Sequence, residues 1–210
     1  MTAAESPIVP VKFEAPRAIE PEDQARADYY ALLANLFYRA PDARLLQAIA
    51  IAEPPSGVLA PAWQRLADAS NVVPEDAVHE EYDAVFVGVG KPPVMLYGSF
   101  YMAGFMMEKP LAALRQDLGE LGFVRAESVR EPEDHLAAIC DVMRAMILGD
   151  LENKPQPVEA QKAFFLTHVK PWIFDCVAAI SAYHQANFYK HVAGFAKSFF
   201  EVEIEAFEIE

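Results

Sequence analysis

Apolar residues recur at intervals of three and four along most of the chain, which is the spacing of one face of an α-helix. The first clear stripe follows Pro21 and ends before Pro41; its members are Tyr29, Leu32, Leu33, Leu36 and Phe37. Similar stripes follow from residue 45 onward, and the last of them contains Ile180, Tyr183, His184, Phe188, Val192, Phe195 and Phe199. Alternating strand patterns are almost absent, so the sequence predicts an all-α fold, a single globular bundle of roughly nine or ten helices.

The same pattern divides the chain into three segments. Residues 1–21 contain several prolines and no sustained period, which predicts a flexible N-terminal arm. Residues 22–200 form the all-helical domain. Residues 201–210 alternate acidic and apolar side chains, so strand pairing, docking in a groove of the chain itself and disorder are all open. For this acidic tail we expect disorder or loose docking.

Composition narrows the class of protein. The chain has 210 residues, of which 53% are hydrophobic, so it can bury a sizeable core. It carries 17 Lys+Arg against 31 Asp+Glu, a net charge of −14. This balance argues against non-specific nucleic-acid binding and against an anionic membrane surface as the main partner. It is compatible with a basic partner, although solubility alone accounts for most of the acidic residues.

Three features of the sequence predict the cellular compartment: the first 20 residues, the uncharged segments and the cysteines. The first 20 residues lack the basic start and apolar run of a secretory signal. The longest uncharged stretch tested, residues 92–107, is shorter than a membrane span and is interrupted by proline and glycine. Cys140 and Cys176 lie in apolar helical patterns, which predicts buried free thiols. We therefore expect a cytoplasmic protein without stable membrane association.

The sequence offers no evident catalytic apparatus. Gly88–Lys91 has the wrong spacing for a phosphate-binding loop, and Pro92 follows the lysine where Ser or Thr is required. The five histidines show no metal-ligand spacing, and no nucleophile elbow is present. We therefore expect neither an enzyme nor a metal site.

The segment Glu131-Pro132-Glu133-Asp134-His135 is the first of two features that stand out. A proline followed by acidic residues is typical of a first helical turn, which predicts that this segment opens a helix. That interpretation does not explain His135, because a cation there would meet the positive end of the helix dipole. A helix start and a binding site both remain open.

The second feature is the clustering of six methionines around this segment and the irregular loop at residues 88–94: Met95, Met102, Met106, Met107, Met143 and Met146. Methionine-rich surfaces accept varied apolar partners, whereas ordinary core filling is the alternative. Together with the neighbouring acidic residues they predict a groove for a peptide with an apolar stretch and a basic end. We assign its apolar wall to Phe86, Met102, Met106 and Met143.

Three motifs carry a family resemblance. They are Glu81-Tyr82-Asp-Ala-Val85-Phe86-Val-Gly88, Pro92-Pro93 followed by Tyr97-Gly-Ser99-Phe-Tyr101, and Glu131-Pro132-Glu-Asp134-His135-Leu136. Phe165-Leu-x-His168 with Trp172, and Phe188-Tyr189, follow in the expected order. The chain thereby resembles the TorD/DmsD/NarJ family of cytoplasmic redox-enzyme maturation chaperones over roughly residues 25–200.

The resemblance implies a system-specific, all-helical chaperone without catalytic activity. Such proteins bind the twin-arginine signal peptide, or the mature part, of the precursor of a molybdenum-cofactor oxidoreductase catalytic subunit. They hold it in the cytoplasm for cofactor insertion before export or assembly. The segment from Tyr97 to Leu114 resembles members associated with formate dehydrogenase. Carried over by position, the peptide-binding residues are Tyr97, Ser99, Tyr101, Glu131, Pro132, Asp134 and His135.

Some points stay open at this level. Gly98 stands where the family often has an acidic residue, which removes one partner for an arginine pair. The resemblance implies no cofactor but leaves weak guanine-nucleotide binding open, and the chain is expected to be a monomer or a domain-swapped dimer. The alternatives are a structural adaptor for a helical partner and a weak GTP-binding switch with Lys91 and His135 near a phosphate.

Overall fold

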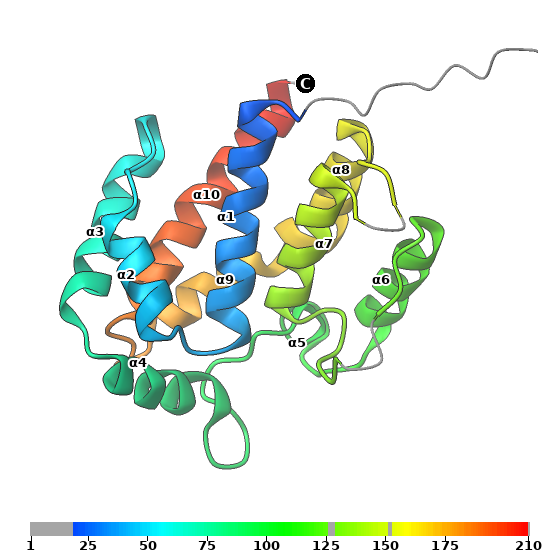
Figure 1. The fold of residues 1–210 in the computed structure, drawn as a ribbon. Helices are drawn as coiled ribbons and strands as arrows, with labels where there is room; N and C mark the ends of the chain where they lie inside the picture. The colour runs from blue at the N-terminus through cyan, green and yellow to red at the C-terminus, as the bar shows by residue number, and fades with distance from the viewer. Residues whose placement is uncertain (1–18, 126–128, 151–152, 210) are drawn as a thin grey trace, which may run out of the picture.

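The computed structural model describes residues 19–125, 129–150 and 153–209, and it confirms the all-α prediction (Figure 1). The ten α-helices of these residues are α1 (Pro21–Tyr38), α2 (Ala43–Ile51), α3 (Ala60–Val72), α4 (Glu75–Tyr82), α5 (Gly98–Ala103), α6 (Lys109–Glu120), α7 (Leu136–Leu148), α8 (Val158–Phe164), α9 (Lys170–Ala182) and α10 (Tyr189–Ile209). A π-helical turn, Asp83–Val87, extends α4, and another, Phe165–Val169, joins α8 to α9. In the described part of the chain, β-pairing is limited to one isolated bridge between Tyr97 and His135.

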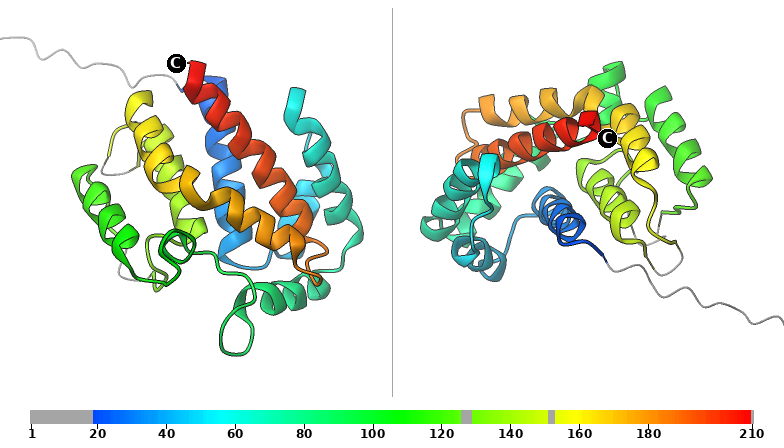
Figure 2. Two further views of the ribbon diagram at one scale, coloured as in Figure 1. Left: turned by 180° about the vertical axis from the view of Figure 1, so that it is seen from behind. Right: turned by 90° about the horizontal axis from the view of Figure 1, so that it is seen from above.

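The helices pack in two layers around one core. Helices α1 and α7 lie side by side, and α9 and α10 cover them from behind (Figures 1 and 2). Helices α2 and α3 flank one side of this arrangement, and α6 and α8 flank the other (Figure 1). The interior is rich in aromatic rings, among which Tyr30, Phe199 and Tyr189 are fully or almost fully buried. Cys140 and Cys176 are buried free thiols, as predicted.

The acidic tail differs from the prediction, because residues 201–209 are the end of α10 and not a disordered segment. Phe200, Glu203 and Phe207 lie on one helical face and are buried. The Glu203 carboxylate accepts hydrogen bonds from Arg26 Nε at 2.7 Å and from Tyr30 Oη at 2.9 Å. These three residues are three and four positions apart, which is helical spacing, but the alternation of acidic and apolar residues around them hid this helical face in the sequence. Residues 1–18 of the predicted arm lie outside the described residues.

The last predicted stripe, residues 180–199, is divided between two helices. Helix α9 ends at Ala182 and α10 begins at Tyr189. The buried Glu81 carboxylate from α4 accepts the backbone N–H groups of Phe188 at 2.9 Å and Tyr189 at 2.7 Å. These N–H groups would otherwise lack partners at the start of a helix, so Glu81 fixes where α10 begins.

The neighbouring residue, Tyr82, connects α4 to α1. Its hydroxyl group donates a hydrogen bond to the carbonyl oxygen of Phe37 at 3.1 Å. The motif that begins at Glu81 therefore ties α4 to both α1 and α10. The N–H of Val94 donates to the carbonyl oxygen of Val85 at 3.1 Å, which connects the motif to the loop that follows.

One described stretch, Val158–Ala182, is long and apolar enough to cross a membrane by length and composition alone. Half of its most apolar window is buried inside the fold. Phe165, Trp172 and Ile173 of this stretch belong to the core. A single stretch of this kind is weak evidence for a span, because a core helix has the same composition.

Candidate functional site

The Glu131–Asp134 segment is a turn that precedes α7 and not its first turn, which corrects the prediction from sequence. Helix α7 begins at Leu136, and His135 is its N-cap. His135 Nδ1 accepts the N–H of Ala137 at 3.1 Å, a role that Ser, Asn or Asp usually plays. An imidazole that accepts at Nδ1 carries its proton on Nε2 and is neutral. His135 therefore meets the helix dipole as an uncharged acceptor, which resolves the conflict noted above.

Two of the sequence motifs are held together by backbone and side-chain hydrogen bonds. Leu136 N–H donates to the carbonyl oxygen of Leu96 at 2.8 Å, and Gly98 N–H donates to that of Asp134 at 2.9 Å. The Asp134 carboxylate accepts the N–H of Ser99 at 2.8 Å, at the start of α5. The structure thus brings the predicted residues of α5 and of the turn before α7 into one place.

Tyr97, Glu131 and His135 form the polar centre of this site. The Tyr97 hydroxyl group donates to Glu131 Oε2 at 2.5 Å, and the Tyr97 and His135 rings are 5.0 Å apart in an edge-on contact. Burial and the bond to Glu131 raise the pKa of Tyr97. Burial lowers the pKa of His135 below its ordinary value, although Glu131 and Asp134 act in the opposite direction. The phenol and the imidazole are consequently both neutral near pH 7.

A small cavity of about 260 Å³, the tyrosine pocket, opens beside this centre. Its walls include Tyr38, Tyr82, Phe86, Tyr97, Glu131 and His135. It lies where the end of α1, the end of α4 and the turn before α7 meet. Phe86, which was assigned to the apolar wall of the groove, lines this pocket together with three phenol rings.

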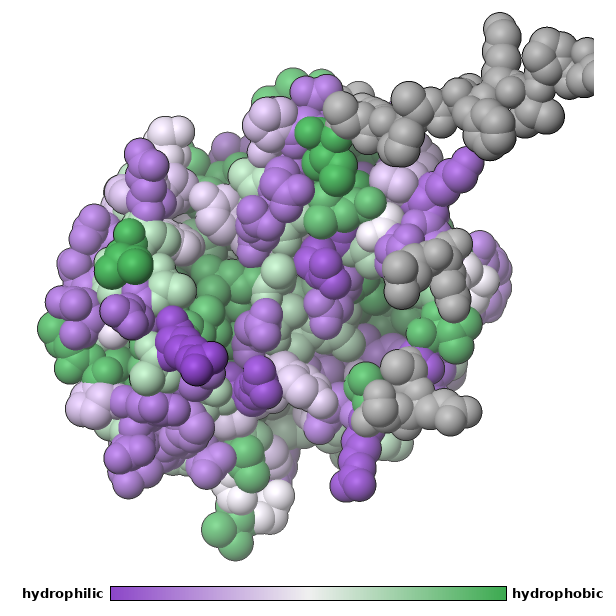
Figure 3. Space-filling model, viewed as in Figure 1, coloured by the Kyte–Doolittle hydropathy of each residue, from purple (hydrophilic) through white to green (hydrophobic). Residues whose placement is uncertain are grey.

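A second cavity of about 490 Å³, the α6–α7 groove, shares Tyr38, Glu131 and His135 with the tyrosine pocket. Its lining is mostly apolar and includes Leu118, Phe123, Val124, Val129, Ala138 and Val142. Figure 3 shows hydrophobic side chains among polar ones on this side of the molecule, over α6 and α7. Glu131 therefore stands between a polar pocket and an apolar groove.

The predicted methionine wall is not formed. Met143 has no exposed surface and belongs to the core, so it faces no groove. Met102 is exposed and Met106 is partly exposed, but neither lines the tyrosine pocket or the α6–α7 groove. Clustering in the sequence was misleading here because methionine also fills irregular core gaps. The apolar residues that do line a groove come from the end of α6, the segment after it and α7.

Several predicted site residues are buried or direct their polar groups inward. Ser99 and Asp134 are buried at 0% and 4% exposure, and Pro132 is buried as well. Tyr101 stacks on Trp172, and its hydroxyl group donates inward to the carbonyl oxygen of Met95 at 2.9 Å. Ser99, Pro132 and Asp134 thus support the site from inside, while Tyr97, Tyr101 and Glu131 are its partly exposed members.

The glycine at position 98 has a packing reason. A Cβ atom there would lie 2.8 Å from Trp172 Nε1 and 3.0 Å from Cε2. Trp172 is 2% exposed, and its Nε1–H donates to the carbonyl oxygen of His168 at 2.6 Å, so the ring cannot yield easily. An acidic side chain at this position is incompatible with this packing.

Sequence reasoning missed Glu133, which lies in the middle of the motif. Its Oε2 is 2.8 Å from Arg115 Nη2 and 2.9 Å from Arg115 Nε, and its Oε1 is 3.5 Å from Arg125 Nε. Partial burial alone would raise the pKa of Glu133, but the hydrogen bond from Arg115 and the charges of both arginines lower it. Arg115 lies on α6 and Arg125 beyond its end, so no local sequence pattern indicates this cluster.

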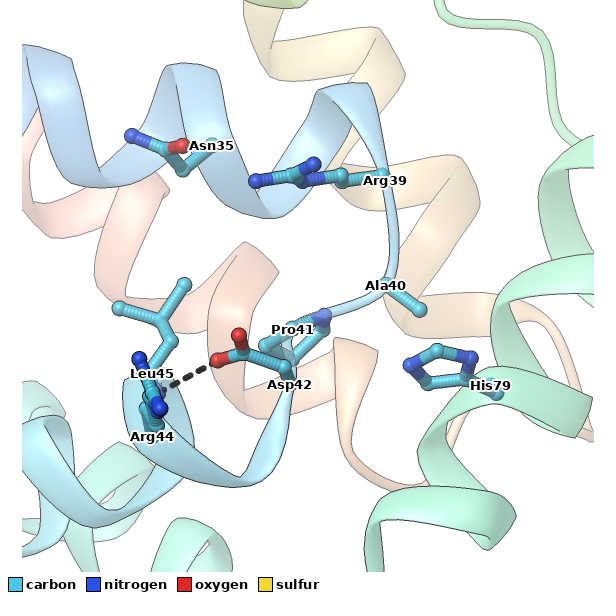
Figure 4. A pocket seen from close by; sticks show the side chains of 8 residues that line it. All are labelled: Asn35, Arg39, Ala40, Pro41, Asp42, Arg44, Leu45 and His79. Carbon is cyan, nitrogen blue, oxygen red and sulfur yellow. Dashed lines mark hydrogen bonds between the residues drawn. The ribbon is translucent and has the colours of Figure 1, made fainter.

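Another concavity, of about 540 Å³, lies elsewhere, between α1, α2 and α4 (Figure 4). Its lining combines the basic Arg39 and Arg44 with the acidic Asp42, and it also includes His79. The Asp42 carboxylate accepts the N–H of Leu45 at 2.8 Å and caps α2. None of the motif residues lines this concavity, so it is not the candidate site. In the described residues, no group of three or more His, Cys, Asp or Glu side chains has the geometry for a metal ion.

The sequence is similar to a known protein family and to a known chaperone. The sequence model of the family described as nitrate reductase delta subunit matches residues 55–178, more than half of the chain and all three motifs. The chaperone protein TorD of Vibrio parahaemolyticus serotype O3:K6 (strain RIMD 2210633) is 27% identical over 147 residues, which are 64% of this chain and 68% of that protein.

A solved structure shows the same fold. It is a crystal structure from Archaeoglobus fulgidus, described as that of a redox enzyme maturation protein, and it superposes with a TM-score of 0.55 at 18% identity. The superposition covers 92% of this chain and 97% of that one. The chain therefore belongs to the TorD-like family of redox-enzyme maturation chaperones, whose members are chaperones and not enzymes.

Proposed function

We propose that this chaperone binds the twin-arginine signal peptide of the precursor of a molybdenum-cofactor oxidoreductase, alone or together with the mature part. It holds this client in the cytoplasm until the cofactor is inserted, before export or assembly. The resemblance of the segment from Tyr97 to Leu114 favours a formate dehydrogenase-like client. The observation that carries the proposal is the position of Glu131, an acidic side chain between the tyrosine pocket and the apolar α6–α7 groove.

The chemistry of such a signal matches this arrangement. It presents two guanidinium groups beside an apolar run. Guanidinium groups pair best with carboxylates, because the two planar groups share two parallel hydrogen bonds. The apolar run would lie in the α6–α7 groove, as in the recognition of a helix by a hydrophobic groove. The net charge of −14 would speed the approach of a basic segment.

The roles within the site follow from access to solvent. Asp134 is almost fully buried and is engaged by the N–H of Ser99, so we assign it a positioning role. Glu131 is partly exposed and lines both cavities, so we assign it direct contact with the client. Tyr97 holds the Glu131 carboxylate at the mouth of the tyrosine pocket through its hydroxyl group.

The test is a titration of the purified full chain with a labelled signal peptide. Glu131→Gln should weaken binding about tenfold, the value expected for losing a hydrogen bond to a charged group. Glu208→Gln removes the same charge from an exposed position near the end of α10 and should leave affinity unchanged. Equal affinity of the Glu131→Gln variant and the unaltered protein, with native helix content, would refute the assignment.

Co-purification distinguishes the proposal from the adaptor alternative. A signal-peptide chaperone should retain a molybdoenzyme precursor and lose it when the leader is deleted. A complex that survives deletion of the leader and binds nothing through it would support the adaptor instead.

A further inference from the structure

Glu133 already holds two guanidinium groups of its own chain. Arg115 contributes Nε and Nη2 to one carboxylate oxygen, at 2.9 and 2.8 Å, and Arg125 Nε lies 3.5 Å from the other oxygen. Arg125 Nη1 also donates to the carbonyl oxygens of Val129 and Glu131, at 3.3 and 3.4 Å. Glu133 and Arg125 both line the α6–α7 groove.

We propose that Glu133 is the anchor for the arginine pair of the client, and that Arg115 and Arg125 occupy this anchor until a client displaces them. The proposal rests on the proposed function and adds a binding residue and a competitor to it. Arg115 and Arg125 would act as internal substitutes for the two arginines of the signal peptide.

The Glu133 side chain is mostly buried, whereas the side chains of its two arginine partners are exposed to solvent. Glu133 stands between two buried residues, Pro132 and Asp134, and its side chain is 16% exposed. The side chains of Arg115 and Arg125 are 52% and 42% exposed. The arginines can therefore move into water without disturbing the core, whereas the carboxylate keeps its place.

The exchange replaces each ion pair with one of the same kind. Ion pairs of exposed side chains contribute little to stability, so giving up the internal pairs costs little. A client guanidinium would keep the partly buried Glu133 carboxylate paired, which avoids the penalty of an uncompensated charge. A lysine pair would replace the internal arginines less well, because an ammonium group cannot form the forked contact that Arg115 makes.

The other carboxylates of the motif are less suited to this role. Asp134 is buried and engaged by Ser99, while one oxygen of Glu131 is taken by the Tyr97 hydroxyl group. Glu133 alone of the three already binds two guanidinium groups in the described structure.

The experiment titrates the full chain with two labelled peptides that differ only at the paired positions, Arg-Arg or Gln-Gln. If the unaltered protein binds both equally, the proposed function itself fails. If it prefers the Arg-Arg peptide, the variants decide the further inference. Arg115→Gln with Arg125→Gln should bind that peptide about fivefold tighter, because the internal competitors are gone.

Glu133→Gln should bind the Arg-Arg peptide at least about fivefold more weakly than the unaltered protein. Adding Glu133→Gln to the double arginine variant should abolish its gain, as in a double-mutant cycle. Lys109→Gln with Lys154→Gln removes the same charge from exposed positions outside the groove and should change affinity less than twofold. If the double arginine variant fails to fold, Arg115→Lys tests the same point, since it keeps the charge, loses the fork and should bind about twofold tighter.

Three results would overturn the inference. The first is an unchanged affinity of Glu133→Gln for the Arg-Arg peptide, which would place the anchor elsewhere. The second is weaker binding by the folded double arginine variant, which would mean that the arginines support the groove. The third is an equal gain in the lysine control, which would reduce the effect to net charge.

Discussion

Replacing Glu81 with alanine tests whether this single carboxylate fixes the start of α10. The side chain accepts two backbone N–H groups at 2.9 and 2.7 Å, and all three residues are buried. Removing the carboxylate leaves both N–H groups without partners, and each unsatisfied buried group costs about 1–3 kcal/mol of stability. This cost already contains the loss of the helix cap. We expect the free energy of unfolding to fall by about 3–4 kcal/mol in total.

The assay is urea denaturation followed by circular dichroism at 222 nm and by tryptophan fluorescence. A loss of this size corresponds to a fall in Tm of roughly 6–16 °C for a chain of this length. Glu80→Ala is the matched control, because Glu80 is exposed on the same helix and should change stability by less than about 0.5 kcal/mol. A loss below about 1 kcal/mol in Glu81→Ala would refute the reasoning, since the buried N–H groups would then have found other partners.

Three further predictions concern the packing and titration of the site and of α10. Gly98→Ala should lower the free energy of unfolding by about 1–3 kcal/mol in urea denaturation, because the added Cβ meets the buried ring of Trp172; unchanged stability would contradict this. His135 has a lowered pKa in the folded state, so below its unfolded pKa of about 6.5 the unfolded chain binds more protons, and stability should fall as the pH drops. His135→Asn keeps a capping acceptor and should lose less stability than the unaltered protein between pH 7.5 and 5.5, measured by denaturation at both values; an equal loss would assign the effect to other groups. Removing residues 202–210 should lower the Tm by more than 5 °C in a thermal melt, because it takes away the buried Phe207 side chain and the Glu203 carboxylate that pairs with Arg26; an unchanged Tm would mean that the end of α10 contributes nothing.

The helices could be predicted from sequence because each buries a stripe that repeats every three to four residues. Pro21 at the start of α1 and Gly122, with its positive φ after α6, both conform to local rules for helix ends. What the pattern did not reveal are contacts between residues far apart in the chain. Glu81 sets the start of α10 from 107 positions away, and no local signal marks the break between Ala182 and Tyr189.

The sequence indicated which motifs lie together, while the peptide-binding role of their residues stays a prediction. The motifs correctly indicated that Tyr97 and Ser99 come together with Asp134 and His135. They did not show which of these side chains reach solvent, because burial depends on the packing of α5 against α9. Glu133 was missed for a similar reason: its two arginine partners come from α6 and the segment after it.

The hydrogen-bonded ion pair between Arg26 and Glu203 can form only when almost the whole chain has been synthesised. The two residues are 177 positions apart, so a growing chain produces α1 long before its partner on α10 exists. Until then Arg26 has no Glu203 to bind, and the apolar face of α1 lacks part of its cover. Contacts of such long range form late and slowly. A ribosome that stalls before residue 203 would therefore hold an incomplete chaperone that itself needs protection from aggregation.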